Sequence, residues 1–157
     1  MSGGIWTLPA GADIALAAGV AKTVLGVRAG AAFAIYLKRL RISFDGVNAA
    51  NTPVLIELCR STFATQPPTG TNNTVVTPVL HTGRSTTVGV TAARNWTTEP
   101  TALTPIEEFR LTPNGGTLAY DEPLQDEPDC DLQEGFVVRL TAVQNVNARP
   151  VLLFGRC

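Results

Sequence analysis

The sequence predicts an all-β fold: a two-sheet antiparallel β-sandwich, jelly-roll-like, with about eight strands and an extended N-terminal arm. Threonine is abundant, and 14 glycines and 11 prolines punctuate the chain, a composition that favours strands and turns. Apolar and polar residues alternate with a period of two along several segments, and no segment has a convincing helical period. Several connections are long, which favours a jelly roll over an immunoglobulin-like sandwich.

The chain is 157 residues long, the size of one ordinary domain. A domain of this length buries roughly 70% of the surface that its unfolded form exposes, so it needs neither a disulfide framework nor a structural metal to fold. We expect an N-terminal arm over residues 1–19 and a single β-sandwich domain over residues 20–157.

The expected arm carries apolar anchors without a sustained period: Ile5, Trp6 and Leu8, followed by Pro9. Aromatic anchors in otherwise extended segments are typical of partner docking. We therefore expect these four residues to contact a partner. The alternative is that Trp6 folds back onto its own sandwich.

The strands of the sandwich are expected from their alternation and from the turn signals between them. The alternation changes phase across Lys38–Arg39, which predicts a β-bulge there because one extra residue reverses the side-chain parity. Glu57 and Arg60 interrupt an apolar run, and each requires a partner or an exposed end. The expected strands are 20–28, 33–44, 53–60, 75–80, 86–91, 106–111, 117–120, 136–143 and 150–154, and turns are expected at 29–31, Asp45–Gly46, 113–116 and 144–148.

Charge and hydropathy exclude two classes of partner. Twelve basic residues stand against 13 acidic ones, a net charge of −1, whereas nucleic-acid binding requires a concentrated basic surface. The most apolar stretch, 14–21, is far shorter than the roughly 20 residues that a membrane span requires. The N-terminus lacks a basic region before an apolar stretch, so we expect synthesis in the cytoplasm of a host cell.

The sequence offers little catalytic chemistry. His81 is the one histidine, and no spacing pairs a nucleophile with a base, so we expect no enzyme, no cofactor and no metal site. Cys59, Cys130 and Cys157 form no metal-binding pattern, and Cys59 lies in an apolar run where a buried thiol is expected. The acidic segment 121–134 is a solvated loop, a partner for a basic surface or, as an alternative, a calcium site that lacks EF-hand spacing.

One basic cluster, Lys38, Arg39 and Arg41, lies at the expected bulge. It is either a solvated strand face or an electrostatic contact with the acidic segment of another copy of the chain, which would set the orientation of the two copies. The second interpretation assigns an inter-subunit contact between these three residues and Asp126 and Asp129.

The order and spacing of the strand-and-turn phrases resemble a family of small tailed-phage virion proteins, the capsid decoration or cement proteins of jelly-roll type. The phrases are 21–25 (AKTVL), 40–46 (LRISFDG), 53–58 (PVLIEL), 96–101 (WTTEPT), 139–142 (RLTA) and 146–147 (VN). The resemblance implies a non-enzymatic protein on the capsid exterior of a virion. It implies further that the protein binds the major capsid protein, stabilises the shell and forms a homo-oligomer, often a trimer, with the arm position at 5–9.

An alternative function is a head-fibre or receptor-binding module that recognises host-surface carbohydrate. Such a module requires a concave site with exposed aromatic rings, because sugars stack on them. Trp96 and Tyr120 are the candidate residues for this site.

Overall fold

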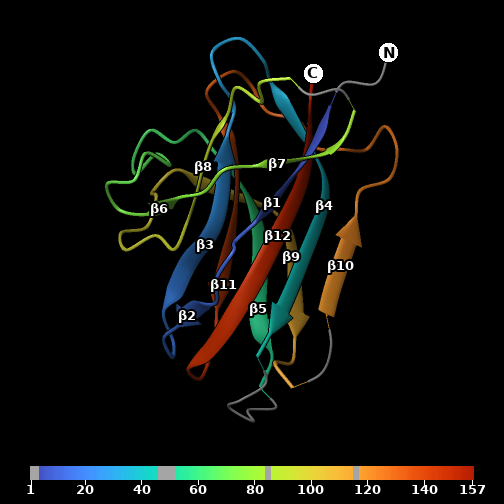
Figure 1. The fold of residues 1–157 in the computed structure, drawn as a ribbon. Coiled ribbons are helices and arrows are strands. Elements are labelled where there is room, and N and C mark those ends of the chain that lie inside the picture. Colours follow the sequence, from blue (N-terminus) through green and yellow to red (C-terminus); the bar gives the residue numbers. More distant parts are fainter. Residues whose placement is uncertain (1–3, 46–51, 84–85, 115–116) are drawn as a thin grey trace.

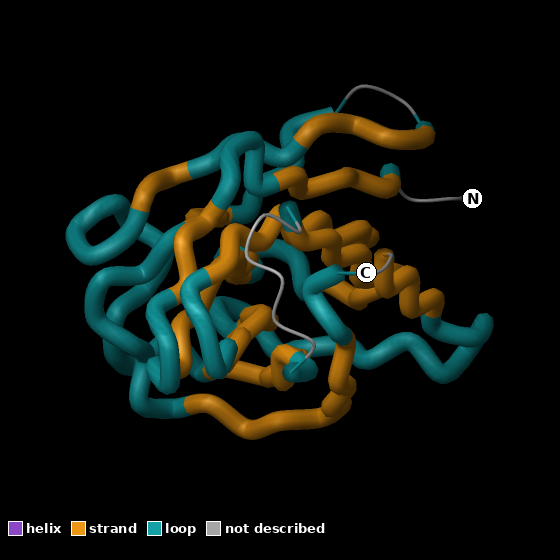
Figure 2. Tube along the Cα trace, turned by 90° about the horizontal axis from the view of Figure 1, so that it is seen from below, coloured by secondary structure: helices purple, strands orange, loops and turns teal. Residues whose placement is uncertain are grey.

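The computed structural model describes residues 4–45, 52–83, 86–114 and 117–157. They form strands and loops and no helix, as Figure 2 shows in a view along the strands. The strands are β1 (Ile5–Pro9), β2 (Ile14–Leu16), β3 (Ala21–Arg28), β4 (Ile35–Phe44), β5 (Val54–Ser61), β6 (Thr74–Val75), β7 (Val79–Thr82), β8 (Thr91–Arg94), β9 (Leu103–Leu111), β10 (Thr117–Asp121), β11 (Gly135–Thr141) and β12 (Val146–Arg156).

Two antiparallel sheets pack face to face, which confirms the predicted β-sandwich (Figure 1). The β12 sheet has the order β10-β4-β12-β1-β7, and β2 pairs with the first three residues of β12. The β11 sheet has the order β6-β8-β3-β11-β5-β9. The sandwich thus has 12 described strands, more than the number expected.

Eight of these strands pair in the nested order of a jelly roll. When β2, β6, β7 and β8 are left out, the remaining eight strands pair from the two ends of the chain inward. The pairs are β1 with β12, β3 with β11, β4 with β10 and β5 with β9. This is one long hairpin of four strand pairs rolled into two sheets. The jelly-roll-like prediction is therefore confirmed.

The N-terminal segment is part of the sandwich, so the prediction of a free arm over residues 1–19 is wrong for residues 4–19, and residues 1–3 lie outside the described part. β1 lies between β12 and β7 in the β12 sheet. Trp6 is 2% exposed and stacks on Phe154, with ring centroids 6.2 Å apart. The alternative, that Trp6 folds back onto its own sandwich, is confirmed. The sequence did not indicate this strand because Ile5 is apolar like the inward-facing Trp6 and Leu8, so apolar and polar residues do not alternate along it.

The predicted β-bulge at Lys38–Arg39 is confirmed. Leu153 on β12 faces Arg39, but the next residue, Phe154, faces Leu37. Lys38 is therefore the extra residue on β4, and its insertion lets Lys38 and Arg39 both point outward while Leu37 stays in the core. β4 ends at Phe44, and the predicted turn Asp45–Gly46 runs into residues outside the described part.

The connection between β5 and β9, residues 62–102, is an insert that extends both sheets. β7 continues the β12 sheet beyond β1, whereas β8 and β6 continue the β11 sheet beyond β3. The strand predicted at 86–91 is wrong: the chain pairs only from Thr91, at the start of β8. The last strand is longer than predicted, because β12 begins at Val146 rather than at Pro150.

The insert also covers part of the outer face of the β11 sheet with a second small core, built from Cys59, Phe63, Ala93, Trp96 and Val137. The Trp96 indole N–H donates to the carbonyl of Gln66 at 2.9 Å. Gly26 lies under this ring, and a Cβ there would come within 2.8 Å of Trp96 Cη2. Part of this outer face is thus buried by the chain itself.

Candidate functional site

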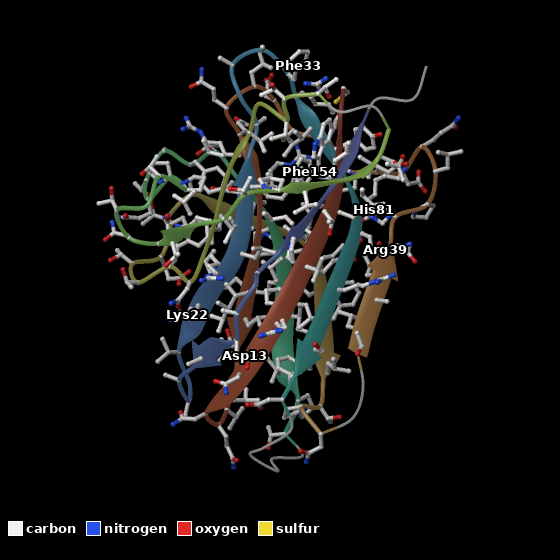
Figure 3. The ribbon with its side chains drawn as sticks, viewed as in Figure 1. Asp13, Lys22, Phe33, Arg39, His81 and Phe154 are labelled. Atoms are coloured by element: carbon white, nitrogen blue, oxygen red, sulfur yellow. The ribbon has the colours of Figure 1, made fainter. Side chains whose placement is uncertain are left out.

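Among the described residues, the outward side chains of the β12 sheet are half-buried or exposed, and this outer face is the candidate functional surface; we call it the open face. Because Trp6 and Leu8 point into the core, their neighbour Thr7 points outward, and the same parity turns residues of β4, β7 and β12 outward. Figure 3 shows His81 and Arg39 on this side of the molecule. The outward residues in the middle of the face are Thr7, Arg39, Arg41, Val79, His81, Val151 and Leu153.

A basic pocket lies in the open face. It is lined by Thr7, Arg39, Arg41, His81, Val151 and Leu153 and holds about 50 Å³ of free space. Arg39 is ion-paired to Asp121, its register partner on β10. Arg41 is exposed and has no ion pair with any residue that the structure describes. The pocket therefore combines an apolar floor from β12 with one uncompensated guanidinium.

An acidic groove adjoins the basic pocket at the start of β4. It is lined by Tyr36, Lys38, Leu124, Glu127, Asp129 and Cys157 and encloses about 320 Å³. Lys38 Nζ lies 3.2 Å from Glu127 Oε1 and 5.5 Å from the centroid of the Tyr36 ring. Hydrogen bonds from its own amide and that of Gln125, with the ammonium of Lys38, hold the pKa of the Glu127 carboxyl below its usual range.

Two of the basic residues expected in an inter-subunit contact form ion pairs within the chain, and the contact between copies stays a prediction. Lys38 and Arg39 do meet the acidic segment, but it is the segment of their own chain, because the bulge on β4 aims both side chains toward the β10–β11 connection. Asp126 and Asp129 are exposed and take no part in the ion pairs of the described residues. Arg41 is the member of the basic cluster that stays available for a partner.

Two carboxylates, Glu107 and Glu122, lie close to the Tyr120 hydroxyl at the side of the sandwich where β9 and β10 are located. The Tyr120 hydroxyl lies 3.2 Å from Glu107 Oε1 and 3.4 Å from Glu122 Oε2, so one hydroxyl proton serves two carboxylates. The other oxygen of Glu122, Oε1, is buried and has no hydrogen-bond partner among the described residues. Burial, and then repulsion from Glu107, raise the pKa of Glu122, and burial together with Glu122 raises the pKa of Tyr120 to about 12.

A buried ion pair crosses the β11 sheet. Glu57, which the sequence shows to need a partner, accepts hydrogen bonds from Arg139 Nη2 at 2.7 Å and Nε at 3.2 Å. The hydrogen bonds that the Arg139 guanidinium donates to the Glu57 carboxylate raise the pKa of Arg139. Burial raises the pKa of the neighbouring Cys59 thiol to about 11, as expected for a structural cysteine. Arg60, the other residue in need of a partner, lies over the Phe136 ring at 5.9 Å.

The described residues contain no group of three histidine, cysteine, aspartate or glutamate side chains arranged to hold a metal ion. Their cysteines are free thiols: Cys59 and Cys130 are buried, and Cys157 is exposed. No helix in the described ranges has the length and apolar character needed to cross a bilayer.

The residues expected to contact a capsid through an arm divide into two sets. Trp6 and Leu8 are core residues, so they offer no surface to a partner. Ile5 and Pro9 are half-buried and share the outward side of β1 with Thr7. The structure thus brings two of the four residues to the open face, beside Arg39 and Arg41.

The aromatic residues required by the carbohydrate-binding alternative are engaged inside the fold. Trp96 is buried in the second core. Tyr120 packs on Phe109, with ring centroids 5.0 Å apart, and its hydroxyl is held by Glu107 and Glu122. Neither ring forms an exposed stacking platform for a sugar.

The chain matches no protein-family model, no curated protein and no solved structure. A jelly roll serves many unrelated functions, so the fold does not identify one. The function is therefore argued from the open face and its chemistry.

Proposed function

We propose that the chain is a non-enzymatic virion structural protein that binds the outer surface of a phage capsid and stabilises the shell. The observation that carries the proposal is the asymmetry of the two outer faces. The insert covers part of the outer face of the β11 sheet with a second small core, whereas the open face of the β12 sheet keeps apolar residues and arginines at the surface.

The composition of the open face fits a protein partner. Val151 and Leu153 are half-buried, Val79 is 56% exposed, and Arg41 stands beside them. Apolar side chains with arginine, at low density of other charges, are typical of the centre of a protein–protein interface. Only 16% of the whole chain is charged, which lowers the cost of removing water from such a face.

The proposed mechanism is avidity. Each copy makes a moderate contact with the major capsid protein, and an oligomer, a trimer by the resemblance, multiplies these contacts without new chemistry. A clamp of this kind on the virion exterior raises the temperature or force at which the shell fails.

Co-sedimentation with purified capsid shells of the encoding phage tests the proposal. The chain offers a matched pair of variants: Val79→Asp on β7 of the open face, and Val75→Asp on β6 of the opposite sheet, where the two valines are 56% and 54% exposed. We expect saturable binding of the wild type and of Val75→Asp. We expect Val79→Asp to bind about tenfold more weakly, because a carboxylate would be desolvated in the interface.

Two results would overturn the proposal. Wild-type protein that does not sediment with shells would exclude capsid binding. Equal losses for Val79→Asp and Val75→Asp would show that the open face has no special part in it.

A further inference from the structure

We propose that the basic pocket receives a carboxylate side chain of the capsid protein and that Arg41 is the residue that recognises it. The inference rests on the proposed function and names the chemistry of the partner. It assigns a specific anchoring site inside the open face.

The first argument is charge. Arg39 and Arg41 both line the pocket, but Arg39 is already neutralised by Asp121 across the β4–β10 pairing. In the acidic groove, Glu127 is held by Lys38 at 3.2 Å. Arg41 therefore contributes a positive charge that no described residue balances. A guanidinium presents a planar fork of donors that matches a carboxylate with two parallel hydrogen bonds.

The second argument is size and shape. The pocket holds about 50 Å³, which suits a carboxylate head and not a whole organic ligand, since small-molecule sites measure roughly 300–1,000 Å³. Val151 and Leu153 give it an apolar floor, and Thr7 and His81 contribute polar groups on the side of β1 and β7. An ion pair formed over an apolar floor and covered by a partner is screened less than one in open water.

The third argument is position. Thr7, Val151 and Leu153 belong both to the pocket and to the open face, so a partner that covers the face also closes the pocket. A partner that places an apolar residue over Arg41 would bury an unpaired charge, which is costly. A partner that places an aspartate or glutamate there satisfies it. The occupant that fits is therefore an acidic side chain of the shell protein bound to this face.

The test uses three variants of the full chain in co-sedimentation with capsid shells. Arg41→Glu reverses the charge in the pocket, Arg41→Lys keeps the charge without the fork, and Arg110→Glu reverses an exposed arginine on β9 of the opposite sheet. We expect Arg41→Glu to weaken binding at least about 30-fold, Arg41→Lys to weaken it less than tenfold, and Arg110→Glu to leave it unchanged. Because Arg41 is exposed, unfolding temperatures of all three variants should match the wild type.

Each other outcome overturns the inference in an identifiable way. If the wild type binds shells and Arg41→Glu binds equally well, the pocket is not the anchor and the proposed function still stands. If the wild type does not bind, the proposed function fails as well. If sedimentation velocity shows that the wild type self-associates and Arg41→Glu does not, the occupant is a second copy of the chain. If Arg41 is required instead for binding to an array of acidic glycans, the partner is carbohydrate.

A charge-swap selection gives a positive readout. Shell-protein variants that restore the binding of Arg41→Glu should carry a basic residue in place of an aspartate or glutamate. Suppressors that map only to apolar positions would contradict a carboxylate in the pocket.

Discussion

The ion pair between Glu57 and Arg139 yields a prediction whose magnitude follows from its burial. Glu57 is 7% exposed, and the Arg139 side chain is 26% exposed, so loss of the carboxylate leaves a guanidinium that only partly reaches water. Breaking a fully buried pair costs about 3–5 kcal/mol, and the partial exposure of Arg139 lowers this. We expect Glu57→Ala to reduce the free energy of unfolding by about 2–3 kcal/mol, or roughly 5–10 °C in melting temperature.

The assay is urea unfolding of Glu57→Ala and of a double-mutant cycle made of Glu57→Leu, Arg139→Leu and the double variant. Replacing both partners by apolar residues removes the unpaired charge as well as the pair, so we expect the double variant to unfold within about 1 kcal/mol of the wild type. The reasoning would be refuted by losses below about 0.5 kcal/mol for Glu57→Ala. It would also be refuted if the two single losses simply added in the double variant.

Three further predictions concern the fold and its pH dependence. Trp6→Ala should cost about 3–5 kcal/mol in urea unfolding because the ring lies in the core; a loss near zero would favour a free arm. The pKa of Glu122 is raised above its ordinary value of 4.5 in the folded state, so the native protein loses stability as the pH rises through that raised pKa. Urea midpoints between pH 4 and 8 should show this loss in the wild type and less of it in Glu122→Gln, and parallel curves would contradict the assignment. Gly135→Ala should abolish soluble expression, since its Cβ would stand 1.9 Å from the Val27 carbonyl oxygen, whereas Gly19→Ala, with φ +72° and open space around it, should cost only about 1 kcal/mol; similar yields and stabilities of the two variants would argue against this packing.

Local patterns predicted the parts of the fold that depend on local geometry. The parity change at Lys38–Arg39 located the bulge, because side-chain alternation in a strand is a property of neighbouring residues. The charged interruption at Glu57 indicated a partner, although its identity, Arg139, depends on strands 82 residues apart. The sequence predicted a jelly-roll-like sandwich but not which strands pair with each other, because pairing between distant strands leaves no local pattern.

The candidate site was harder to predict than the fold. Trp6 had the features of a docking anchor, but its pairing with β12 is made by residues at the opposite end of the chain. The sequence showed the basic cluster but not which of its residues would be paired. Lys38 and Arg39 form ion pairs and Arg41 forms none with a described residue, because of where the acidic segment folds back. The sequence showed no catalytic partner for His81, and nothing local indicated that it would line a pocket with the two arginines.

The proposed function places the capsid against the open face of the β12 sheet. An electron cryo-microscopy reconstruction of capsid shells incubated with the purified protein tests this most directly. We predict added density on the shell exterior in which Thr7, Arg41 and Leu153 face the capsid protein and the second core around Trp96 faces solvent. Density bound through the outer face of the β11 sheet would contradict binding through the open face, and shells with no added density would contradict capsid binding altogether.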